Sequence, residues 1–133
     1  MNKLCGVYFD TWASKWVSKS SDMDLAKIPA PFNVVYLAFA QPDMTYKSGS
    51  YNLSGTGLNF SQDFSVVKGA IKILQAKGTK VMLSVGGASY LNWAGMNTKA
   101  IDALVLDLEL DGVDIDFEPS YYGLAFIIYL INT

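Results

Sequence analysis

The stretch DGVDIDFE, residues 111–118, decides how this sequence is interpreted. Three acids alternate in it with three apolar residues: Asp114, Asp116 and Glu118 against Val113, Ile115 and Phe117. Side chains of a strand point to opposite faces with a period of two. The stretch therefore predicts a strand with one apolar face and one face of three carboxyl groups. Neighbouring carboxylates repel one another, and this repulsion raises at least one pKa, as an acid catalyst requires.

The composition fits one α/β domain. The chain has 133 residues, of which 51% are hydrophobic and 17% charged, a bias that suits strands buried on both faces. All ten basic residues are lysines and the net charge is −2, so we expect no nucleic-acid partner. The apolar run at residues 124–131 is too short to span a bilayer, and we expect no membrane partner.

The chain contains no histidine. This absence excludes Ser-His-Asp and Cys-His catalysis as well as zinc sites with histidine ligands. The single cysteine, Cys5, lies in an apolar run and is expected to be a buried core thiol. Residues 1–9 show no signal peptide, because no small-residue cleavage site follows the short apolar run.

Strands and helices alternate along the sequence. Strands are expected at residues 3–9, 32–40, 80–87 and 111–118, the first of them buried on both faces. A short helix is expected at residues 23–28. Of two longer helices, the first is expected to be capped at its start by Asp63 or Ser61, and the second to start at Asn97 or Thr98. Gly78 is expected to end the first long helix. Such alternation implies parallel strands joined by right-handed crossovers.

Two segments outside these elements draw attention. Trp12 and Trp16 lie in the connection after the first strand, where they either cap the core or form a stacking platform for a ligand ring. Residues 41–60 form a long loop rich in Gly, Ser, Asn and Tyr, and a loop of this length is expected to be functional or mobile.

Together, these motifs resemble the family 18 glycoside hydrolases, the chitinase family. Residues 111–118 fit that family's D-x-x-D-x-D-x-E signature at every position, and residues 84–87, SVGG, fit its S-x-G-G motif one strand earlier. Gly6 and Tyr8 on the first strand and Phe39 on the second resemble its opening strands. The resemblance implies a (β/α)8 TIM barrel with its site at the carboxyl ends of the strands. We expect residues 1–133 to be the N-terminal part of that catalytic domain, with about the first four β/α units.

The resemblance also implies roles. Glu118 would protonate the leaving oxygen and then activate water, Asp116 would orient the substrate's acetamido group, and Asp114 would share a proton or hydrogen bond with Asp116. The substrate would be chitin or N-acetylglucosamine oligosaccharides, cleaved at β-1,4 bonds with retention. The acetamido oxygen, rather than an enzyme carboxylate, would be the nucleophile. No cofactor is implied, and secretion is compatible with the family.

The remaining expected site residues support the acids or the sugar. Tyr8, Phe39, Gly86 and Gly87 are expected at the substrate. Ser84 is expected to help hold Asp114, and Asp111 to bond nearby backbone. A Mg²⁺ or Ca²⁺ site is the rival interpretation of the acids, but no further ligand set is evident and no metal is expected.

Three functional alternatives stay open at this point. The first is a chitinase segment whose 133 residues alone are inactive, because a barrel takes about 250 residues. The second is an endo-β-N-acetylglucosaminidase acting on glycoprotein glycans, which shares the motif. The third is a non-catalytic, lectin-like chitin binder, against which the presence of Glu118 argues.

Overall fold

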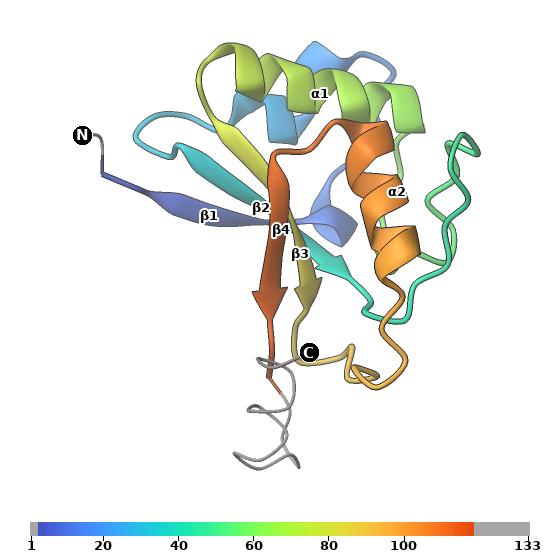
Figure 1. The fold of residues 1–133 in the computed structure, drawn as a ribbon. Coiled ribbons are helices and arrows are strands. Elements are labelled where there is room, and N and C mark those ends of the chain that lie inside the picture. Colours follow the sequence, from blue (N-terminus) through green and yellow to red (C-terminus); the bar gives the residue numbers. More distant parts are fainter. Residues whose placement is uncertain (1–2, 119–133) are drawn as a thin grey trace.

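The computed structural model describes residues 3–118 and shows a parallel sheet with helices (Figure 1). Its strands stand in the order in which they occur in the chain: β1 (Gly6–Asp10), β2 (Val34–Ala40), β3 (Lys80–Gly86) and β4 (Gly112–Asp116). All neighbours pair in parallel. The predicted α/β class, the parallel strands and their order are thus confirmed. Closure into eight strands stays a prediction, because residues 3–118 supply four.

Two α-helices and three short 3-10 helices connect the strands: α1 (Phe64–Ala76), α2 (Thr98–Leu108), η1 (Thr11–Ala13), η2 (Ser20–Asp22) and η3 (Asp24–Lys27). Gly78 follows α1 with a φ of +87°, as expected of a helix-ending glycine. Asn97 caps α2, since its side chain accepts a hydrogen bond from the Ala100 N–H. Asp63 precedes α1, but its side chain accepts no capping hydrogen bond, which corrects the expected cap.

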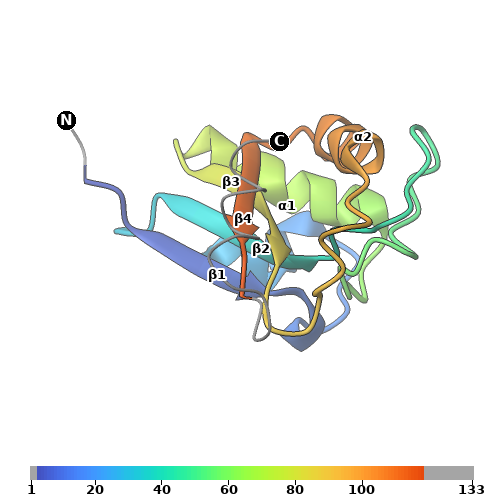
Figure 2. The same ribbon diagram turned by 60° about the horizontal axis from the view of Figure 1, so that its bottom comes forward.

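The core lies between one face of the sheet and the helices. In Figure 2, α1 lies behind the strands. Fully buried aliphatic side chains from both layers fill the space between them: Val35, Leu37, Val81 and Leu83 from the sheet, and Val67, Ile71, Leu74 and Leu104 from the helices. Burying such side chains stabilises the fold by about 1.5–3 kcal/mol each. This packing fixes the helical face of the sheet and leaves the opposite face for other contacts.

The two edge strands are less buried than the sequence suggested. In β1, Val7 and Phe9 pack against the core, whereas Tyr8 is 48% exposed. In β4, Ile115 is 49% exposed, whereas Val113 and, just after the strand, Phe117 are partly buried against the core, so the predicted apolar face is only partly covered. The reason is positional, because β1 and β4 each have one neighbour within residues 3–118. A strand with two neighbours and helices on one side would be covered further.

Three further side chains lie nearer to solvent than a core role requires. Cys5 is half-buried rather than a core thiol, which corrects that expectation. Trp12 and Trp16 are 55% and 60% exposed, so core capping is wrong for both within residues 3–118. None of the helices in this range combines the length and apolarity that a bilayer crossing requires. The apolar run at residues 124–131 lies outside the described residues.

Candidate active site

The carboxyl groups of β4 lie beside β3 at the carboxyl ends of the strands. Register pairs Ser84 with Asp114 and Gly86 with Asp116. The Ser84 hydroxyl, which is fully buried, donates a hydrogen bond of 2.8 Å to Oδ2 of Asp114. A buried hydroxyl must find such a partner, because an unpaired one costs about 1–3 kcal/mol. The pair therefore fixes the orientation of Asp114.

Tyr8 reaches the same carboxyl group from β1. Its hydroxyl is hydrogen-bonded to the side chain of Asp114, and its ring lies 5.0 Å from that of Tyr36 and 5.8 Å from that of Phe39. Burial and then the negative charges of Asp114 and Asp116 raise the pKa of Tyr8. A phenol with a raised pKa stays protonated and can donate. Asp114 is thus held from two sides, by Ser84 and by Tyr8.

Asp116 lies between the other two acids. Burial raises the pKa of Asp116, as do its hydrogen bond with Glu118 and the charges of Glu118 and Asp114. The sequence predicted that at least one of these acids would have a raised pKa, and Asp116 confirms it. Protons of such a group belong to the cluster rather than to a single residue. Asp116 and Glu118 therefore share a hydrogen bond that one proton can satisfy.

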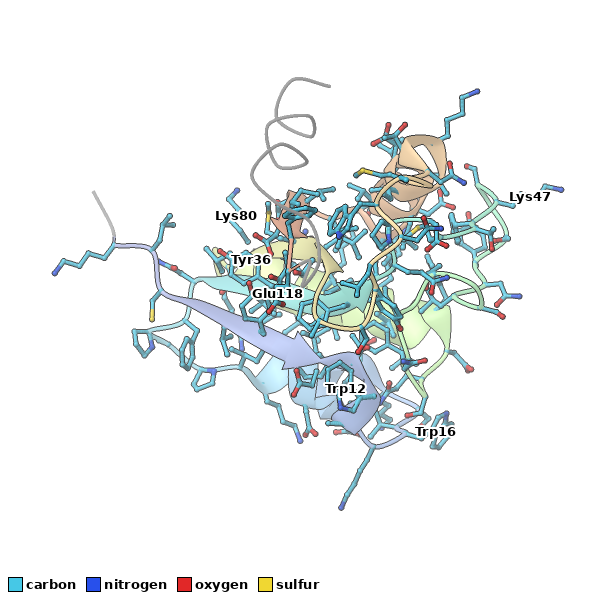
Figure 3. All side chains as sticks on the ribbon, turned by 90° about the horizontal axis from the view of Figure 1, so that it is seen from below. Trp12, Trp16, Tyr36, Lys47, Lys80 and Glu118 are labelled. Carbon is cyan, nitrogen blue, oxygen red and sulfur yellow. The ribbon has the colours of Figure 1, made fainter. Side chains whose placement is uncertain are left out.

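Glu118 follows the end of β4 and is exposed. Figure 3 looks at the carboxyl ends of the strands and shows Glu118 over the sheet, with Trp12 just beyond the end of β1. An exposed acid at this edge is open to a substrate. The described geometry thus gives a row of acids that runs from a held Asp114 to an accessible Glu118.

The glycine pair at the end of β3, Gly86 and Gly87, allows a close approach of protein backbone. A Cβ on Gly86 would lie 2.1 Å from the Asp116 carbonyl oxygen, and one on Gly87 would lie 3.0 Å from the Phe39 ring. The φ values are +117° and +82°, and the Gly87 N–H donates to the Asp116 carbonyl at 2.9 Å. A larger residue at either position would therefore collide with other atoms of the protein itself. Contact of either glycine with a substrate stays a prediction.

Asp111 lies at the opposite end of β4 from Glu118. Its Oδ2 accepts hydrogen bonds from the Val81 N–H at 2.8 Å and from Gln75 Nε2 at 3.1 Å. Lys80 Nζ lies 3.9 Å from its other oxygen. The residue therefore anchors the start of β4 to β3, which is the backbone contact suggested for it.

A hollow of about 300 Å³ lies beside the glycine pair. It is lined by aromatic, small and polar residues: Trp12, Phe39, Gly57, Asn59, Gly86, Ala88, Ser89 and Tyr90. Tyr90 closes one side, because its hydroxyl donates to the Gly57 carbonyl at 2.8 Å. The sequence left two roles open for Trp12, a cap on the core or a stacking platform for a ligand. In the structure its side chain lines a hollow next to the carboxylates. An exposed ring in such a place offers a flat apolar face to a ligand.

The comparisons with known proteins agree on one class. No family model matches the chain. Exochitinase 1 of Streptomyces olivaceoviridis is 32% identical over 103 residues, which cover 71% of this chain and 17% of that protein. A solved structure of a provisionally named chitinase A from Streptomyces coelicolor has a TM-score of 0.59 and 21% identity, over 96% of this chain and 43% of that one. A family GH18 chitinase from Chromobacterium violaceum has a TM-score of 0.51 and 24% identity, over 71% and 25%.

The chain resembles chitinases. The exochitinase match carries the likeness in sequence, and the two solved structures carry the likeness in fold. The chitinase-like chain spans less than half of the length of each of these proteins.

Several neighbours of the site in this chitinase-like chain escaped the sequence analysis. Asn59 and Tyr90 line the hollow beside Gly86, and Trp93 packs against Gly86 and Phe117. A long loop rich in Gly and Asn was the one available signal for Asn59. Within residues 3–118 no three Asp, Glu or Cys side chains are arranged to hold a metal ion.

Proposed function

We propose that the row of acids on β4 belongs to a catalytic site that hydrolyses β-1,4 bonds between N-acetylglucosamine units of chitin or chitooligosaccharides. The observation that carries the proposal is the arrangement of Asp114, Asp116 and Glu118 as one coupled group, anchored by Ser84 at 2.8 Å. The chitinases among the similar proteins support this substrate class.

Glu118 is the proposed proton donor. It is the exposed acid at the end of the strand, so it can reach a glycosidic oxygen. Its proton passes to the leaving sugar as the bond to the anomeric carbon breaks. The substrate's acetamido oxygen bonds to that carbon and forms a positively charged oxazolinium ring. Glu118, now a carboxylate, takes a proton from the water that opens this ring, and the starting configuration is restored.

Asp116 is the proposed partner of the acetamido group. Its carboxyl group is hydrogen-bonded to Glu118 and has a raised pKa, so it can carry the proton that keeps two neighbouring acids from repelling each other. When this proton lies on Glu118 instead, Asp116 is a carboxylate that accepts a hydrogen bond from the acetamido N–H, orients the attacking oxygen and stabilises the cation. Asp114, next along the strand, is held in place by Ser84 and Tyr8.

We further propose that these strands form the first four units of an eight-stranded (β/α)8 barrel, of which residues 1–133 are the N-terminal part. On this proposal the 133-residue chain alone has no measurable turnover. The exposure of Tyr8 and Ile115, at 48% and 49%, supports it. These side chains belong to the two edge strands, which would gain neighbours on closure. A half-open site admits water and cannot hold a sugar ring on all sides.

The test is the variant Glu118→Gln in the longest natural product of the gene, assayed on chitin oligosaccharides. Glutamine keeps the shape but cannot donate a proton to an oxygen, so we expect turnover to fall by roughly 10²–10⁴-fold, while sugar affinity is retained. The matched control is Glu109→Gln, which changes the only other glutamate of the chain. Full turnover in Glu118→Gln would refute the assignment. Cleavage of glycoprotein glycans instead of chitin oligomers would replace the proposed substrate.

A further inference from the structure

A second hollow lies on the long loop between β2 and α1. It has a volume of about 430 Å³, and its walls include Tyr51, Asn52, Asn59, Gln62 and Phe64. A neighbouring hollow of about 410 Å³ shares Tyr51 and Phe64 with it. We call the first the Tyr51 hollow. Asn59 lines both the Tyr51 hollow and the hollow beside Gly86, so one residue joins it to the surroundings of the acids.

An aromatic pair, the exposed Tyr51 and the partly buried Phe64, forms one wall of the Tyr51 hollow. Tyr51 is 58% exposed, and its ring centroid lies 5.2 Å from that of Phe64. The backbone of Tyr51 has a φ of +53°, in the left-handed region that non-glycine residues rarely occupy. Such a conformation costs about 1–3 kcal/mol and persists where the surroundings impose it, often at ligand sites. The fold thus holds a large ring in solvent at an energetic disadvantage.

The loop that carries Tyr51 is fixed before any ligand binds. The side chain of Asp107 on α2 accepts a hydrogen bond from the Tyr46 hydroxyl at 2.6 Å and one from the Gly49 N–H at 2.8 Å. The Thr45 N–H donates to the Gly55 carbonyl at 3.0 Å. A fixed loop loses little entropy on binding, which favours affinity.

A buried acceptor on the wall of this hollow lacks a partner. Gln62 is 5% exposed, and its Nε2 donates to the Ser14 hydroxyl and to the Lys15 carbonyl. These two bonds fix which side of the amide carries the oxygen. Its Oε1 has no hydrogen-bond partner among residues 3–118. A buried oxygen of this kind is costly unless a donor reaches it, and a ligand hydroxyl or amide N–H is such a donor.

We propose that the Tyr51 hollow is a second sugar-binding site, which takes a neutral N-acetylglucosamine ring of a chitin chain away from the acids. The choice of this sugar rests on the proposed function. The pyranose ring would lie on the Tyr51 ring, with its hydroxyls and acetamido group toward the amides of Asn52, Asn59 and Gln62. Among the residues that line the Tyr51 hollow and the neighbouring hollow of about 410 Å³, the charged ones are Asp63 and Lys68, of opposite sign. A balanced charge favours a neutral ligand over an ionic one.

The experiment titrates the isotope-labelled Glu118→Gln chain with the soluble tetramer of N-acetylglucosamine and follows backbone amide signals by NMR. Two groups of signals report separately: residues 51–54 and 62–64, which line the Tyr51 hollow and not the hollow beside Gly86, and residues 84–87 for the acids. Tyr51→Asn removes the ring, and asparagine tolerates the left-handed backbone, so the fold is kept. Tyr51→Phe keeps the ring. The control is Leu106→Ala, which shortens an exposed side chain on α2.

We expect signals of residues 51–54 and 62–64 to shift on titration, with an affinity that falls roughly fivefold to tenfold in Tyr51→Asn. Tyr51→Phe and Leu106→Ala should bind like the parent. Shifts at residues 51–54 and 62–64 without shifts at residues 84–87 would support this site. The proposed function would then rest on the turnover assay of Glu118→Gln, because the half-open site of this chain cannot hold a sugar ring on all sides. Shifts at residues 84–87 alone would overturn this site and leave the proposed function standing. No shift at either place, or equal binding in Tyr51→Asn, would also overturn it.

Discussion

Replacing Gly86 with alanine tests how closely β3 approaches β4 beside the acids. A Cβ at this position would lie 2.1 Å from the Asp116 carbonyl oxygen and 2.5 Å from Cζ2 of Trp93. The φ of +117° adds backbone strain. Such strain costs about 1–3 kcal/mol, and overpacking costs about 1–3 kcal/mol more. We therefore expect the free energy of unfolding to fall by about 4 kcal/mol, and Asp116 to be displaced.

The assay is urea unfolding of the chain followed by circular dichroism, and Gly49→Ala is the matched control. Gly49 also has a positive φ, +78°, but nothing lies within 4 Å of a Cβ placed there. This control carries the backbone strain without the overlap, and we expect a loss of about 1–2 kcal/mol. The difference between the two variants measures the overlap with Asp116 and Trp93. Equal losses in both variants would refute the close-approach reasoning.

Two further predictions concern protonation. Burial and the hydrogen bond to Asp107 raise the pKa of Tyr46 from 10.0 to about 12; the resulting stabilisation is present below pH 10 and is lost as the pH rises toward 12. In Asp107→Asn the absorbance of the phenolate should therefore appear at lower pH, and an unchanged titration would contradict the assigned hydrogen bond. Asp116 has a raised pKa in the folded chain, so its contribution to stability is lost as the pH rises above the ordinary carboxyl range. In Asp116→Asn the urea midpoint should therefore fall less steeply with rising pH than in the parent chain. A steeper fall in the variant would contradict the raised pKa of Asp116.

The elements of the fold were predictable because each depends on local sequence. Gly78 ends α1 through its positive φ, and Asn97 starts α2 through its side chain, both short-range effects. The capping role expected of Asp63 failed, since its side chain does not turn back to the helix. Burial of β1 failed for a different reason, because it depends on how many neighbours a strand has. Neither the type of a residue nor the hydrophobic periodicity of a strand shows how many neighbouring strands it will have.

The features of the candidate site can likewise be separated into those that local sequence predicted and those that depend on tertiary contacts. The period of two in residues 111–118 determined that Asp114, Asp116 and Glu118 share a face, since alternation is a property of any strand. Which acid has a raised pKa depends on burial and on contacts across the sheet, so only the tertiary structure identified Asp116. Likewise, Ser84 meets Asp114 because parallel register sets β3 beside β4, and Tyr8 contacts Asp114 from β1, which is not a neighbour of β4 in the sheet.

The sequence by itself determined that this chain builds parallel strands with an acidic carboxyl end, because periodicity and turn residues act over a few positions. The tertiary structure decided what surrounds those acids. It placed Trp12 beside Gly86 and set Tyr51 and Gln62 on a hollow joined to it through Asn59. These residues are far apart in the chain, and their proximity follows from the packing of a long loop against α1 and α2, which no local pattern encodes.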